Sequence, residues 1–220
     1  MSSTSALEKL TIRILPLVAG GLTLLLLVGV WLAPAEARLG NLVKLVYVHG
    51  ALVWTGLLSF TLAGVLGLVA LVVRRPIWYR GTRAAGVAAL IVWIVYIISS
   101  MAVTGLTWGQ LIAWNEPRVR ATGLILVAAV VLALVAWLMD HGGFTAAVNV
   151  IMGVVPWVVV RQAGVIRHPV DPIGGSGSAA IQGFYVLIVI TVAALAATLI
   201  AWLWARAELR SRREMAVNAG

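Results

Sequence analysis

The sequence predicts an all-α membrane protein with six transmembrane helices. Of its 220 residues, 62% are hydrophobic and 10% are charged, and the mean hydropathy is +1.06. A soluble domain of this length has too little interior to bury so much apolar surface, so part of the solvent must be lipid. Several apolar runs reach the roughly 18–20 residues that a helix needs to cross hydrocarbon. These runs do not alternate apolar and polar residues, as the strands of a membrane β-barrel do.

The six predicted spans form one membrane domain over residues 1–220, with a basic cytoplasmic tail at 205–220. The first span ends near Ala33-Pro34-Ala35, which resembles a signal-peptidase site, but its apolar core is longer than that of a signal peptide, so we expect a retained helix. The second span is about 43 Å long as a helix, against about 30 Å of hydrocarbon. In the fifth span, Pro156 predicts a kink. The spans are 12–32, 45–73, 84–104, 121–139, 145–160 and 180–204.

Basic residues near the ends of the spans predict the orientation. One side collects ten of them and the other side six, so both termini are expected in the cytoplasm and the chain in the cytoplasmic (inner) membrane. The net charge of +9 is then explained by topology and lipid headgroups, and nucleic acid is not an expected partner. The first, third and fifth loops face outward and carry His49, a tryptophan-rich loop and His168, whereas His141 falls on the cytoplasmic side.

Two of the three histidines are therefore expected on one face of the membrane, with His49 at or just above the outer interface. Taken singly, each is more simply a helix-start or exposed-loop histidine. Taken together, two neutral imidazoles suit the axial positions of haem iron. Zinc would need three or four ligands, and the outer loops add only Glu36, Glu116 and Asp171. His49 and His168 are thus candidate metal ligands.

The tryptophan loop supplies the other candidate contacts. The indoles of Trp108 and Trp114, with Gly109 beside the first, offer faces on which a porphyrin stacks. Arg118 and Arg120 are candidate partners for haem propionates, although lipid phosphate is an equally good one. Because the chain has no cysteine, the haem would be a non-covalent haem b.

These motifs resemble the haem-handling proteins of cytochrome c biogenesis, and most closely the small six-span CcmC type (haem exporter protein C). Tyr47-Val48-His49 followed by Trp54 resembles the family's Tyr-x-His-x-x-x-x-Trp. The pairs Trp108-Gly109 and Trp114-Asn115 resemble its Trp-Gly-x-x-Trp-x-Trp-Asp core. Val155-Pro156, before His168, resembles the stretch preceding its second histidine. The resemblance covers nearly the whole chain, and the chain departs from the signature at Ile112 (for tryptophan) and Asn115 (for aspartate).

The resemblance implies that His49 and His168 are axial ligands and that Trp108, Gly109 and Trp114 form a haem-docking platform. It further implies that haem is presented on the outer face for transfer to a haem chaperone, alongside subunits of an ABC transporter. The protein would be a binding and delivery module of cytochrome complex assembly and not an enzyme, and the chain shows no Ser-His-Asp set, nucleotide loop or paired buried carboxylates.

Two other functions stay open from the sequence. A permease subunit of an ABC-type transporter would bind no haem and would need a cytoplasmic coupling surface, for which Trp78 and Tyr79 among four arginines are candidates. A b-type electron carrier would hold its haem permanently. An absorption spectrum separates the permease from the haem proteins, and haem transfer to an acceptor separates delivery from electron transfer.

Overall fold

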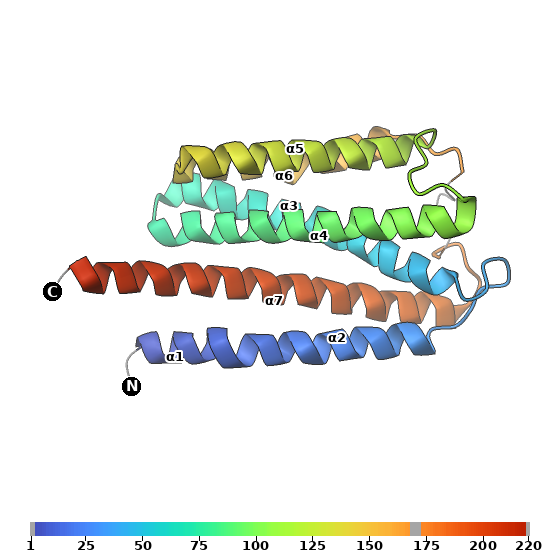
Figure 1. Ribbon diagram of the computed structural model, residues 1–220, viewed down its shortest axis with the longest axis horizontal. Helices are drawn as coiled ribbons and strands as arrows, with labels where there is room; N and C mark the ends of the chain where they lie inside the picture. Colours follow the sequence, from blue (N-terminus) through green and yellow to red (C-terminus); the bar gives the residue numbers. More distant parts are fainter. Residues whose placement is uncertain (1–2, 168–172, 219–220) are drawn as a thin grey trace.

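The computed structural model describes residues 3–167 and 173–218, and within them it is built from helices (Figure 1). The first membrane helix is continuous through a π-helical turn. Six helices are long and apolar enough to cross a membrane, which confirms the predicted fold class. The helices are α1 (Ser3–Lys9), the π-helix η1 (Leu10–Ile14), α2 (Leu15–Leu32), α3 (Val43–Val73), α4 (Pro76–Trp108), α5 (Pro117–Met139), α6 (Gly142–Gln162) and α7 (Ala179–Asn218).

Most of the helices extend beyond the predicted spans. The predicted loop at 74–83 is reduced to Arg74 and Arg75, because Pro76 occupies the first turn of α4, where its missing N–H costs nothing. Trp78 and Tyr79 therefore lie on a helix rather than in a loop. The predicted tail likewise continues α7 as a helix to Asn218, so that its 40 residues span roughly 60 Å. The predicted spans are shorter because hydropathy marks only the part of a helix that suits hydrocarbon, whereas these helices continue beyond that part.

The helices lie roughly along one axis, with α3 at the centre of the packing (Figure 1). α3 contacts α4, α6 and α7. The helix α5 covers α4 and α6, and α2 pairs with α7. One end of the bundle gathers the α2–α3, α4–α5 and α6–α7 connections, and we call it the loop end. The opposite end holds both termini with the α3–α4 and α5–α6 connections (Figure 1). This is the grouping that the number of crossings predicts.

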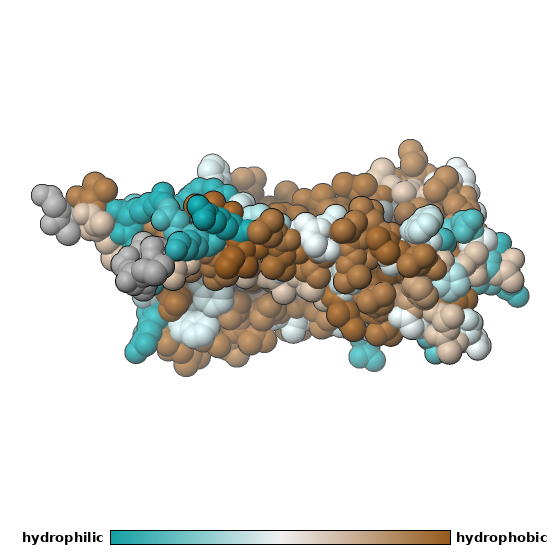
Figure 2. Space-filling model, turned by 90° about the horizontal axis from the view of Figure 1, so that it is seen from below, coloured by the Kyte–Doolittle hydropathy of each residue, from teal (hydrophilic) through white to brown (hydrophobic). Residues whose placement is uncertain are grey.

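The surface fits a chain surrounded by lipid. Hydrophobic residues cover most of the middle of the molecule, and hydrophilic ones gather toward its two ends (Figure 2). Large apolar side chains point outward along the helices, among them Leu17, Val72 and Leu124, which are 75%, 73% and 67% exposed. Exposed apolar surface of this extent is what a hydrocarbon environment favours.

α3 and α6 approach closely because glycines line their contact. A Cβ atom on Gly64 would lie 3.0 Å from the Gly153 Cα, and one on Gly67 would lie 2.6 Å from the Ala146 carbonyl oxygen. Such small residues let membrane helices pack backbone to backbone. Beside this contact, the Asn149 Nδ2 of α6 donates to the Thr82 carbonyl of α4 over 2.9 Å, so a polar bond also ties α4 to α6.

Candidate functional site

His49 lies inside α3, six residues after its first residue and within the span predicted over 45–73. This places the imidazole about 9 Å below the start of the helix. The residue is 8% exposed. α3 begins two residues before the predicted span, at Val43. His49 is near the loop end of the bundle, as predicted.

Hydrogen bonds define which nitrogen of His49 carries its proton. The Ser99 Oγ of α4 donates its only hydrogen to the Tyr96 carbonyl over 2.7 Å. The same oxygen lies 3.3 Å from the His49 Nδ1, so it must accept there and Nδ1 must be the donor. In the neutral imidazole, Nε2 then has the lone pair. Metal-bound histidines commonly donate their second ring N–H in this way.

An aromatic cluster extends from His49 into the core. The His49 and Tyr96 rings lie 5.1 Å apart between centroids, Tyr96 and Trp93 lie 4.7 Å apart, and Trp93 and Phe60 lie 5.7 Å apart. Trp93 is fully buried and donates from Nε1 to the Thr122 carbonyl over 3.2 Å, which joins α4 to α5. His49 is thus held by a rigid set of rings rather than by a loop.

The tryptophan loop connects α4 and α5 at the loop end. Trp108 is the last residue of α4 and is partly buried, and Gly109 follows with φ +71°, a left-handed conformation that favours glycine. The Thr104 Oγ1 donates to the Leu111 carbonyl over 2.8 Å and holds the loop against α4. Trp114 is 64% exposed. The loop therefore presents one indole to the surroundings and partly covers the other.

Glu116 joins this loop to the segment that precedes His168, a role that the sequence reasoning missed. Its carboxylate is 1% exposed and accepts hydrogen bonds from two consecutive backbone N–H groups. The Arg167 N–H lies 2.8 Å from Oε2, and the Ile166 N–H lies 3.2 Å from Oε1. The pair Glu116-Pro117 marks the start of α5, because proline in the first turn of a helix places the preceding residue at the N-cap, but it does not indicate this long-range pairing.

The two candidate arginines, Arg118 and Arg120, differ in burial. Arg118 is partly buried on the first turn of α5, and its Nε is buried without a hydrogen-bond partner. Arg120 is exposed. Because the two residues are two positions apart on a helix, their side chains leave it in different directions. The buried, unsatisfied donor makes Arg118 the better candidate for an anionic group.

The other two histidines stand differently with respect to the prediction. His168 and Asp171 lie outside the described residues, so the pairing of His49 with His168 stays a prediction. His141 is at the opposite end of the bundle, where its Nδ1 accepts from the Phe144 N–H over 3.1 Å as the N-cap of α6. The prediction that His141 lies on the opposite side from the candidate site is consistent with this position.

Comparison with known proteins adds no relative. No protein-family model matches the chain, and no curated protein matches it.

Proposed function

We propose that the protein binds haem b non-covalently at the loop end of the bundle and presents it, on the outer face of the cytoplasmic membrane, for delivery in cytochrome c maturation. His49 and His168 would be the axial ligands. Trp108, Gly109 and Trp114 would form the docking platform, and Arg118 or Arg120 would meet the propionates. Such a protein would resemble the CcmC type, and its delivery partners would be a haem chaperone and ABC transporter subunits.

The bond pattern around Glu116 carries the proposal. Its carboxylate brings the tryptophan loop and the residue immediately before His168 together, at the same end of the bundle as His49. Three sequence segments that were singled out independently therefore converge. The two hydrogen bonds fix the backbone at Ile166 and Arg167, and preorganisation of this kind reduces the cost of binding.

Two local features fit the chemistry of haem. The Nδ1 contact of His49 with Ser99 fits a ligating histidine, because metal-bound histidines commonly hold their second ring nitrogen in a hydrogen bond. The buried Arg118 Nε lacks a partner, and a propionate would supply the charge-assisted acceptor that such a donor favours. Iron bound to two imidazoles would supply a reversible anchor for the ring.

Haem content of purified variants tests the proposal. We expect the Soret band and the pyridine haemochrome signal of the detergent-purified protein to fall at least tenfold in His49→Ala and in His168→Ala. His141→Ala, at the other end of the bundle, should keep the wild-type content. Equal haem content in all three variants would refute the assignment, and a wild-type protein without haem would favour the permease.

A transfer assay separates delivery from electron transfer. Haem-loaded protein is mixed with an apo-acceptor of high haem affinity, and the Soret band of each is followed after separation. Delivery predicts that haem leaves the wild-type protein for the acceptor, whereas a b-type electron carrier would retain it.

A further inference from the structure

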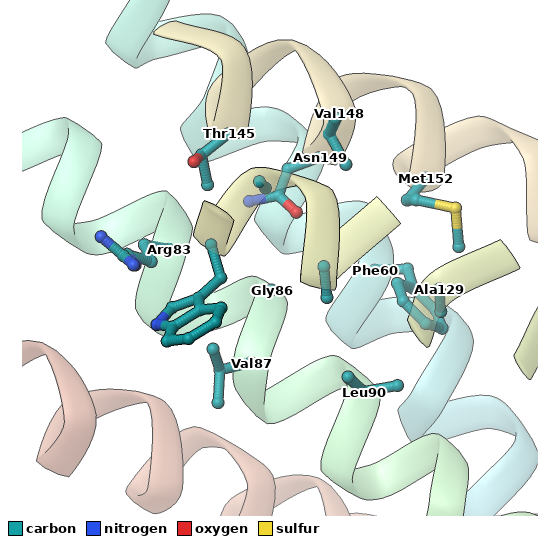
Figure 3. Close-up of a pocket in the computed structure, with 13 residues that line it drawn as sticks. Phe60, Arg83, Gly86, Val87, Leu90, Ala129, Thr145, Val148, Asn149 and Met152 are labelled. Carbon is teal, nitrogen blue, oxygen red and sulfur yellow. The ribbon is translucent and has the colours of Figure 1, made fainter. Parts of the chain in front are cut away.

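A pocket opens between α4, α5 and α6, toward the end of the bundle that holds the termini (Figure 3). Its volume is about 120 Å³, below the roughly 300 Å³ at which sites for drug-sized ligands begin. It therefore admits a narrow group, such as one hydrocarbon chain, and not a porphyrin. Its lining does not include His49, but Phe60 is shared with the ring cluster that begins at His49.

The pocket is apolar at its inner end. Leu90 of α4, Phe60 of α3 and Met152 of α6 close it, and Ala129 and Ala133 of α5 leave the space open where larger side chains would fill it. Val87 lines it too and is 41% exposed, so the pocket opens toward the lipid-facing surface. A hydrocarbon chain suits such a lining.

Asn149 places an unsatisfied acceptor in the middle of the pocket. The residue is 9% exposed and points from α6 toward Gly86 of α4 (Figure 3). Its Nδ2 donates to the Thr82 carbonyl and hydroxyl, both at 2.9 Å. Its Oδ1 receives no hydrogen bond from the residues that the structure describes. This oxygen is open to the largely apolar pocket, so a ligand that donates a hydrogen bond to it is favoured.

Arg83 lies at the mouth of the pocket, one helical turn before Gly86 and therefore closer to the end of the bundle. Its Nη1 donates to the Asp140 Oδ1 over 3.1 Å, and Asp140 is 79% exposed. A guanidinium has five N–H donors, and this bond uses one of them. The position and the remaining donors suit a phosphate at the level of the lipid headgroups.

We propose that this pocket binds a lysophospholipid. The order along α4 is a cation at Arg83, an acceptor at Asn149 beside Gly86, and an apolar end at Leu90. A lysophospholipid has the same order: a phosphate, a free glycerol hydroxyl and one acyl chain. A diacyl phospholipid has an ester in place of that hydroxyl, and an ester accepts hydrogen bonds but donates none, so it leaves the Asn149 Oδ1 unsatisfied.

Native mass spectrometry of the full chain in detergent tests this assignment with three probes. They are lysophosphatidylcholine, its analogue lacking the free glycerol hydroxyl, and diacyl phosphatidylcholine, because a choline headgroup adds no hydroxyl of its own. We expect the first to bind and the other two to bind at least about tenfold more weakly, a difference that corresponds to about 1.4 kcal/mol. Changing the lipid and not Asn149 leaves the bond from Asn149 to Thr82 undisturbed.

Two variants and a control locate the site. Ala133→Leu fills the pocket and should weaken binding of the lysophospholipid at least tenfold, whereas Val127→Leu, on the exposed face of the same helix, should not. Arg83→Gln should also weaken it tenfold, and it keeps the test decisive if Ala133→Leu fails to fold, because the ion pair of Arg83 is at the surface. Equal binding of the three lipids, or unchanged binding in Arg83→Gln, would overturn the proposal.

Discussion

Glu116 is the residue whose environment differs most from what its sequence context suggests. It lies in a polar loop segment between Trp114 and Arg118, yet it is almost completely buried. A buried carboxylate requires hydrogen-bond donors, because transfer of an unpaired charge out of water is strongly unfavourable. The Ile166 and Arg167 N–H groups supply them from a segment fifty residues away. No local pattern in the sequence predicts such a pairing.

Glu116→Ala should destabilise the protein, because it leaves two backbone N–H groups without their acceptor. We expect a loss of about 1–3 kcal/mol in the free energy of unfolding, measured by denaturation in detergent. Haem affinity should fall as well if Glu116 positions the segment before His168. Glu214→Ala, which removes an exposed carboxylate near the end of α7, is the matched control and should change neither quantity. A Glu116→Ala variant with wild-type stability would contradict this account.

Glu36 predicts that the stability of a turn at the loop end depends on pH. Its carboxylate accepts from the Leu39 and Arg38 N–H groups, both over 2.9 Å. These bonds lower the pKa of Glu36 below its ordinary value, Leu39 contributing most. A lowered pKa in the folded state means that the turn is favoured above the ordinary pKa of the carboxyl, and that this contribution is lost as the pH falls through the lowered value.

Amide hydrogen exchange at Leu39 and Arg38 measures this effect. We expect exchange, corrected for its intrinsic pH dependence, to become faster as the pH falls through the lowered pKa of Glu36. In Glu36→Gln the two amides should exchange faster at neutral pH and show no corrected pH dependence. Wild-type protection that does not change with pH would show that the carboxylate does not hold the turn.

At the scale of the helices, the sequence predicts the existence of each element better than its ends. The apolar runs locate all six helices, because hydrocarbon requires about twenty consecutive apolar residues. They miss the helix ends that continue into water, as at Trp78 and Tyr79 on α4. Caps such as Pro76 and Pro117 were the better guides to these ends.

The close contact between α3 and α6 yields a test at this scale. A Cβ atom on Gly67 would lie 2.6 Å from the Ala146 carbonyl oxygen, which belongs to the backbone and moves only with its helix. Gly67→Ala should therefore destabilise the protein by about 1–3 kcal/mol. Gly20→Ala on α2 is the control, since a Cβ there meets nothing within 4 Å, and it should be neutral or stabilising by up to about 1 kcal/mol. Equal melting temperatures in detergent would show that the two helices can separate slightly without cost.

At the scale of the whole molecule, the number of crossings predicted which connections lie at the same end of the bundle. It did not predict which helices contact one another. An even number of spans brings the odd-numbered connections to one end, whatever the exact helix boundaries are. Hydropathy carries no information on which helices touch, so the central position of α3 and the pairing of α2 with α7 could not be predicted. Nor could the bonds of Asn149 and Glu116, which join residues far apart in the chain.

The excess of basic residues at the end that holds the termini predicts the orientation of the bundle in the membrane. We expect that end in the cytoplasm. The chain lacks cysteine, so a single introduced thiol reports its own side without any background. Two exposed positions serve: Met215 near the end of α7, and Gln110 in the tryptophan loop. A membrane-impermeant maleimide should label Gln110→Cys in intact spheroplasts and Met215→Cys only after the membrane is permeabilised. The reverse pattern would place the tryptophan loop, Glu116 and the candidate haem ligands in the cytoplasm, where delivery to an outer-face chaperone is impossible.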